Sequence, residues 1–197
     1  MENHKQNVQF VQAIINSITN TAAASVIALK NFASQGVFKV KVENPVTEMD
    51  VKGEVEVTNT KEIEKKVIAE SPDMIITAAF GKIISKKTIK APKFGALNIH
   101  PSLLPKYRGA SPIQNALLNG DEVTGVTLMI MNEKMDEGKI LAQKRVAIEE
   151  SDSYENLSRK LAETGAEILM EAIPEWINGK IKPISQNGKA TYTKPIT

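Results

Sequence analysis

The sequence predicts an α/β protein with an open, mostly parallel twisted sheet and helices on both faces of that sheet. Apolar runs of strand length alternate with helical segments along most of the 197 residues, a pattern typical of parallel strands joined by right-handed crossovers. The run at 74–79 is continuously apolar, which indicates a central strand covered on both faces.

The first seventy residues predict two helices and two short strands. Residues 8–18 have no clear period, so this segment can be either a strand or a helix. Gly36 follows the first helix by a few residues, and Asn59 with Glu62 forms a capping box for the second. The expected elements are a helix at 22–32, a strand at 37–42, a loop at 45–53, a strand at 54–57 and a helix from 59 to about 70.

The rest of the chain predicts four strands and two helices. Ser111 caps the first of these helices with Pro112 at its first position. Asp152 caps the second with Glu155 at the third helical position, and Pro174 bends or divides it. The expected strands are 74–79, 96–100, 125–131 and 140–148, the last two pairing antiparallel across the turn at 132–138.

Composition narrows the function classes. The net charge of +2 is too small to argue for nucleic acid or an acidic membrane as a partner. The absence of cysteine excludes thiol nucleophiles, disulfides and Cys-ligated zinc, and it fits a reducing compartment. No apolar run approaches the roughly 18 residues that span a bilayer. We therefore expect a cytoplasmic protein that does not enter a membrane and has no Cys-ligated zinc.

The most informative motif joins an amide and one of only two histidines at the end of a predicted strand. Because side chains alternate along a strand, Asn98 and His100 share one face while Ile99 points to the other. Pro101 and Pro105 then stop the strand and place both polar groups beside a loop. An amide donor beside a group that titrates near neutrality suits carbonyl chemistry. Taken alone, the pattern is more often a core histidine bonded to a neighbouring amide.

Six segments between residues 71 and 148 favour a catalytic interpretation of Asn98 and His100 over a structural one. They are 72–76, 79–84, 98–109, 111–114, 125–127 and 135–138. In content, order and spacing the chain resembles the folate-dependent formyltransferases, above all the branch that acts on methionyl-tRNA. The resemblance implies a Rossmann-like formyltransferase fold. It also implies transfer of a formyl group from formyltetrahydrofolate to the amino group of methionyl-tRNA, with no metal.

The resemblance also assigns residues. It implies that Asn98 donates its amide to the oxyanion of the tetrahedral intermediate. His100 donates to the same oxygen or moves a proton. Asp136 holds the imidazole and relays protons through water. Without the resemblance, Asp136 reads as part of a solvated, charged turn.

Two further groups of residues follow from the resemblance. The folate-binding group is Phe80, Gly81, Lys82, Ile83, Ile84 and Met135. The acceptor-side group is Ser102, Leu103, Leu104, Pro105 and Arg108. From sequence alone, residues 80–84 are equally a strand end packed on a helix, and a surface ion pair is the default for Arg108.

The chain departs from the family pattern mainly in its first sixty residues. It has no glycine before Gly36, where the family brings bare backbone close to the acceptor, and 44–50 is acidic where the family is basic. Glu137 stands where the family usually has threonine, and Ser85 where it has proline.

We expect residues 1–183 to form the catalytic domain, with 1–60 divergent, and 184–197 to be a linker-like tail. In the family, such a tail leads into a C-terminal tRNA-binding domain. We expect that domain to be absent here, so methionyl-tRNA should bind this chain only weakly. Two other functions remain open: formylation of a nucleotide-linked amino sugar, and folate binding by a relative whose acceptor site has decayed.

Overall fold

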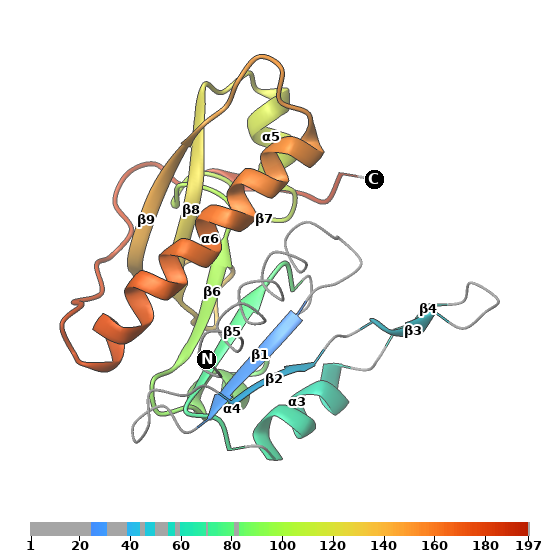
Figure 1. Cartoon of the computed structure of the whole chain (residues 1–197), viewed down its shortest axis with the longest axis vertical. Helices are drawn as coiled ribbons and strands as arrows, with labels where there is room; N and C mark the ends of the chain where they lie inside the picture. Colours follow the sequence, from blue (N-terminus) through green and yellow to red (C-terminus); the bar gives the residue numbers. More distant parts are fainter. Residues whose placement is uncertain are drawn as a thin grey trace, which may run out of the picture. The chain divides into compact units, whose positions relative to one another are not determined.

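The computed structural model describes residues 25–30, 39–43, 46–49, 55–57, 60–69, 71–80 and 83–196. The chain divides into two compact units, Met1–Leu97 and Asn98–Thr197, whose elements are labelled in Figure 1. The expectations for 8–18, Gly36 and Asn59 lie outside the described residues.

Three neighbouring strands in the order β2-β1-β5 organise the first unit. Strand β1 is antiparallel to both of its neighbours, and all five residues of β5 are buried, as predicted for a strand covered on both faces. The elements of this unit are β1 Ser25–Lys30, β2 Lys39–Glu43, β3 Val46–Met49, β4 Val55–Val57, α3 Thr60–Ala69, β5 Met74–Ala78 and α4 Lys86–Lys90.

Two predictions for the first unit are wrong. The helix expected at 22–32 is replaced by strand β1, whose backbone pairs with strands on both sides. The alanines before it suggested a helix, but the β-branched Val26 and Ile27 favour a strand, and pairing on both edges outweighs a weak propensity. The loop expected at 45–53 contains strand β3, which pairs antiparallel with β4.

The second unit is built on the neighbouring strands β6-β8-β9. Strands β8 and β9 pair antiparallel from Val123↔Ala147 to Met129↔Ile140, which confirms the predicted hairpin. Helix α6 packs along this pair, as Figure 1 shows. The elements are β6 Ala96–His100, which begins in the first unit, β7 Arg108–Gly109, α5 Pro112–Leu118, β8 Val123–Ile130, β9 Ile140–Ala147, α6 Tyr154–Ile177 and β10 Tyr192–Thr193.

Taken together, these elements confirm the α/β class. The pairs β1·β2, β1·β5 and β8·β9 are antiparallel, so the strand arrangement is mixed. Among the described residues, no helix has the length and apolar character needed to cross a membrane.

The helix caps differ in detail from the sequence prediction. Ser111 is the N-cap residue of α5, but at φ 58° its side chain makes no capping bond, and its Oγ accepts from Ile196 N at 3.1 Å. Helix α6 is capped by Ser153 instead of Asp152, because the extended Ser153 places its Oγ within reach of Asn156 N. Pro174 lies inside α6 without dividing it.

Residues 184–196, here called the C-terminal segment, lie against the second unit. Ile184 exchanges two backbone hydrogen bonds with Ile140, at 2.8 and 3.0 Å. Strand β10 then pairs in parallel with β7, joining Tyr192 to Arg108 and Thr193 to Gly109. This part of the sequence, which reads as a linker, therefore reaches the loop that follows strand β6.

Candidate active site

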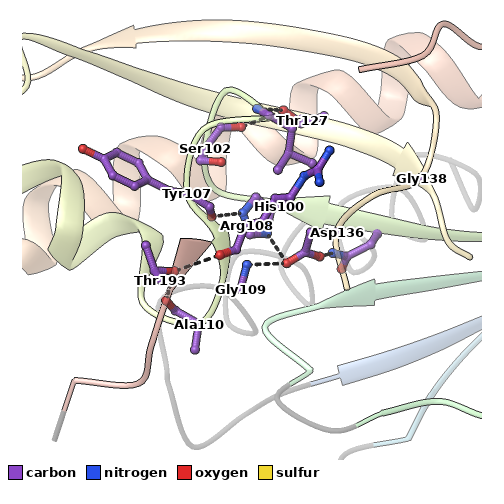
Figure 2. A network of polar contacts seen from close by, with 12 residues as sticks. His100, Ser102, Tyr107, Arg108, Gly109, Ala110, Thr127, Asp136, Gly138 and Thr193 are labelled. Carbon is purple, nitrogen blue, oxygen red and sulfur yellow. Dashed lines mark hydrogen bonds and ion pairs between the residues drawn. The ribbon is translucent and has the colours of Figure 1, made fainter. Parts of the chain in front are cut away.

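His100 ends strand β6 and lies inside the protein, with 4% of its surface exposed. Its Nε2 is 2.9 Å from the carbonyl oxygen of Tyr107. A carbonyl only accepts hydrogen bonds, so this geometry places a hydrogen on Nε2. Nδ1 faces Asp136 Oδ2 at 3.7 Å (Figure 2). The neutral ring therefore donates to Tyr107 and leaves Nδ1 as an acceptor nitrogen that faces Asp136.

Asp136 projects from the turn between β8 and β9, where its backbone has a positive φ of 51°. Its carboxylate receives hydrogen bonds on both oxygens. Gly109 N donates to Oδ2 at 2.7 Å and Asn98 Nδ2 donates to Oδ1 at 3.4 Å. Figure 2 shows the carboxylate between Gly109 and the His100 ring. The structure thus gathers the three predicted catalytic residues around one carboxylate.

This arrangement supports chemistry on a carbonyl group. The Asn98 amide and His100 Nδ1 face the two oxygens of the same carboxylate, so both groups lie close to Asp136. A side-chain amide such as that of Asn98 is a hydrogen-bond donor of the kind that stabilises an oxygen carrying negative charge.

Most of the predicted acceptor-side residues are fixed within the protein. Ser102 is fully buried and donates from Oγ to Lys106 O at 2.6 Å, while Leu104 packs with Met129 and Ile140. Leu103 lies close to Gly125, where an added Cβ would come within 2.6 Å of its side chain. These side chains shape the loop after β6.

Pro105 and Arg108 of the same loop meet the C-terminal segment. The carbonyl of Pro105 accepts from Thr191 N at 3.2 Å. The Arg108 guanidinium donates through Nε and Nη2 to Gln186 Oε1, at 3.1 and 2.8 Å, and through Nη1 to the Tyr192 hydroxyl at 2.9 Å. Nη1 also lies 3.2 Å from Glu137 Oε1. The guanidinium is thus held within the second unit, as the ion-pair alternative expected.

The predicted folate-binding residues fall in both units. Phe80 is half-buried and Ile84 buried, whereas Ile83 is 92% exposed. Gly81 and Lys82 lie outside the described residues. In the second unit, Met135 is 60% exposed at the turn that carries Asp136. Ile83 and Met135 thus present apolar side chains to solvent.

Sequence reasoning missed several groups that the structure places at this site. Gln186 donates from Nε2 to the carbonyls of Asp136 and Gly138, at 2.7 and 2.9 Å, from 50 residues away in sequence. Tyr107 contributes through its main-chain carbonyl, and Thr193 donates to the carbonyls of Arg108 and Ala110. Main-chain groups have no sequence signature, and no motif linked Gln186 to the turn.

Charges near the site are paired. The Tyr192 hydroxyl lowers the pKa of Glu137, and Lys134 and Arg108 act in the same direction. A hydrogen bond to Asp121 raises the pKa of Lys106, whose Nζ lies 2.7 Å from Oδ2. Within the described part of the chain, no three His, Cys, Asp or Glu side chains gather in a way that could hold a metal ion.

The fold and these residues define a class of proteins, namely α/β proteins with Asn, His and Asp side chains gathered at the end of a sheet strand. Comparison with known proteins makes the assignment specific. The formyl transferase family model matches residues 1–173, and the chain belongs to this family.

The similar proteins include methionyl-tRNA formyltransferases. The one from Hydrogenobaculum sp. (strain Y04AAS1) is 47% identical over 135 residues, covering 68% of this chain and 45% of the relative. The one from Enterococcus faecalis is 42% identical over 165 residues, covering 81% and 53%. The chain therefore spans about half the length of the curated relatives that it matches.

Among solved structures, the formyltransferase PseJ from Anoxybacillus kamchatkensis is similar in fold, with a TM-score of 0.59 and 27% identity. The match covers 75% of this chain and 71% of that one. That structure holds UDP-4,6-dideoxy-4-formamido-L-AltNAc and tetrahydrofolate.

Proposed function

We propose that this chain transfers a formyl group from formyltetrahydrofolate to the amino group of methionyl-tRNA. The observation that carries the proposal is the convergence of Asn98, His100 and Asp136 on one point, with the His100 ring 3.7 Å from the Asp136 carboxylate. Membership of the formyl transferase family supports the reaction type. The names of the relatives at 42–47% identity support the acceptor.

Each of the three residues has a distinct task in this proposal. When the acceptor amine attacks the formyl carbon, the carbonyl oxygen becomes an oxyanion, and the Asn98 amide donates to it. His100, whose Nε2 is held by the Tyr107 carbonyl, uses Nδ1 to move the proton that leaves the amine. Asp136 orients the ring. The Gly109 N–H, at 2.7 Å from Oδ2, keeps the carboxylate in place for this task.

For the formyl donor, we propose two candidate contact segments, residues 80–84 and the turn at 132–136, each within its own unit. The exposed apolar side chains of Ile83 and Met135 suit the flat pterin ring, which needs aliphatic cover. Calorimetric titration with a stable formyltetrahydrofolate analogue tests each segment separately, with Ile83→Asp and Met135→Asp as the variants. Each variant should weaken binding, and unchanged affinity in both would contradict this placement.

The decisive test of the reaction is a formyl-transfer assay on variants of the three residues. We expect His100→Ala and Asp136→Asn to lower kcat/KM by at least about 100-fold, the usual contribution of a positioned acid or base. Asn98→Ala should cost about 10²–10³-fold through loss of an oxyanion donor. Glu150→Gln, an exposed change in the turn after β9, serves as the control. Near-normal turnover in all three variants would show that the mechanism is wrong.

The identity of the acceptor is tested by comparing formyl transfer by the wild-type chain to different acceptors. A relative solved with a nucleotide-linked formamido sugar makes such amino sugars the competing acceptors. Faster transfer to an amino sugar linked to UDP than to methionyl-tRNA would replace the proposed acceptor. Tight folate binding without transfer to either acceptor would identify a folate-binding relative that has lost its acceptor site.

A further inference from the structure

We propose that Gln186 is a positioning residue of the active site, acting through the turn that carries Asp136. The inference rests on the proposed function of Asp136 in formyl transfer. Gln186 lies in the C-terminal segment, outside the residues 1–173 that the family model matches. Its side chain nevertheless bridges two parts of the site that are distant in sequence.

The hydrogen-bonding capacity of the Gln186 amide is fully used. Nε2 donates to the carbonyls of Asp136 and Gly138, at 2.7 and 2.9 Å. Oε1 accepts from Nε and Nη2 of Arg108, at 3.1 and 2.8 Å. A primary amide has two donor hydrogens and two acceptor lone pairs, so all four positions are occupied. The half-buried side chain is thus fixed in one orientation.

The two donor bonds hold the backbone on both sides of Glu137. Asp136 has a left-handed backbone conformation, with φ 51°, which is unfavourable for a residue with a Cβ unless its surroundings hold it. The bonds from Nε2 supply such support at the residue whose carboxylate faces His100. Loss of these bonds leaves the turn free to rotate the carboxylate away from the ring.

The same segment also fixes the other partner of the carboxylate. Gly109, whose N–H donates to Asp136 Oδ2, lies in β7 and pairs with Thr193 of β10. Thr193 Oγ1 further donates to the carbonyls of Arg108 and Ala110. The C-terminal segment therefore holds both the donor and the acceptor of the 2.7 Å bond between Gly109 and Asp136. In this view residues 184–193 are part of the catalytic site.

Two variants of Gln186 separate the effect of its donor group, Nε2, from that of its acceptor, Oε1. Gln186→Met keeps the length of the side chain and removes every hydrogen bond. Gln186→Glu keeps the acceptor for Arg108 but loses the donors to the turn, and it sets a negative oxygen against two carbonyls. Asn187→Ala, at the exposed neighbouring residue, is the matched control.

Two measurements on the full chain test the proposal. Because a displacement of about 1 Å in a catalytic group can cost about 100-fold, we expect kcat to fall by about 10-fold or more in Gln186→Met and Gln186→Glu. KM for both substrates should stay within about two-fold, since neither is bound by Gln186. Hydrogen exchange at the Gly109 amide, followed by NMR, should be at least about ten-fold faster than in wild type, because its acceptor is no longer held. Asn187→Ala should leave both values unchanged.

The outcomes distinguish this inference from the proposed function. Unchanged kcat and unchanged Gly109 exchange in Gln186→Met would overturn the positioning role. A fall in kcat that matches only the loss of folded protein, with normal exchange in the folded fraction, would also overturn it. A wild-type chain without transfer activity overturns the proposed function. In that case, faster hydrogen exchange at the Gly109 amide in the variants would still show that Gln186 stabilises the turn that carries Asp136.

Discussion

Among single residues, the site depends on close approaches that only particular side chains permit. Gly109 illustrates this. Its N–H is a hydrogen-bond donor to the central carboxylate, and its φ of +99° lies in the region that favours glycine. A Cβ at this position would come within 2.6 Å of the Thr193 carbonyl oxygen. The absence of a side chain therefore allows β10 to lie beside β7.

We predict that Gly109→Ala is more destabilising than Gly120→Ala and also lowers formyl transfer. Gly120 has φ +64° and open space where a Cβ would stand, so its variant should lose only the backbone preference, about 1–2 kcal/mol. Gly109→Ala must in addition displace the Thr193 backbone. Denaturant unfolding and the transfer assay measure both effects. Equal losses of stability would show that the contact with Thr193 is unimportant.

Among the helices and strands, α6 shows how packing and capping combine. Its buried residues include Leu157, Leu161, Ile168 and Ala172, which follow one another at helical spacing. Its first turn is held by Ser153 and by Asp152, which lies just before the helix. Asp152 Oδ2 accepts from Glu149 N at 2.9 Å and from Lys160 Nζ at 2.7 Å.

These contacts predict a dependence of stability on pH. The hydrogen bond from Lys160 lowers the pKa of Asp152 below its ordinary value of 3.8, and the Glu149 N–H adds to this effect. A lowered pKa means that the contribution to stability is present above the unfolded value and is lost as the pH falls through the folded value. Asp152→Asn should therefore lower the free energy of unfolding near pH 7, and the difference from wild type should vanish well below pH 3.8.

Lys160→Met is the companion variant for this prediction, because it removes the first cause of the shift. If the two side chains act as a pair, the double variant should lose less stability than the sum of the single variants. Urea unfolding at several pH values gives the free energies. A difference between wild type and Asp152→Asn that persists at acid pH would contradict the pairing.

For the molecule as a whole, surface charge limits what the chain can bind. The net charge is only +2. Two basic residues of the loop after β6 are also engaged within the protein: Lys106 pairs with Asp121 at 2.7 Å and Arg108 with Glu137 at 3.2 Å. A phosphate that bound either side chain would have to compete with a carboxylate already in place.

We therefore predict weak, strongly screened binding of methionyl-tRNA by this chain. Few available phosphate contacts should leave a Kd no tighter than about 10⁻⁶ M at physiological salt, and binding should weaken further as the salt concentration rises. Filter binding at several salt concentrations is the measurement. Lys106→Gln should change the affinity little, because its ammonium is already paired with Asp121. Tight binding that resists salt would contradict this view of the acceptor side.

Local patterns in the sequence were enough to predict much of the order of the elements and the shared face of Asn98 and His100, whereas the roles proposed for Asn98, His100 and Asp136 came from the family resemblance. Strand β6 ends at His100 as predicted, because Pro101 follows it, and the alternation of side chains along this strand put Asn98 and His100 on one face. The hairpin of β8 and β9 and the buried strand β5 also followed from local patterns. Such features depend on neighbouring residues, which a sequence displays directly.

The residues that surround Asn98, His100 and Asp136 are brought to the site only by the tertiary structure. Every residue carries a carbonyl, so the path of the loop alone selects Tyr107 as the partner of His100. Gln186 and Asp136 are 50 residues apart, and nothing in their local sequence relates them. The helix predicted in place of strand β1 was wrong for the same reason, since pairing with distant strands outweighed a local helix preference. Contacts between distant segments are made by folding, and local propensity does not encode them.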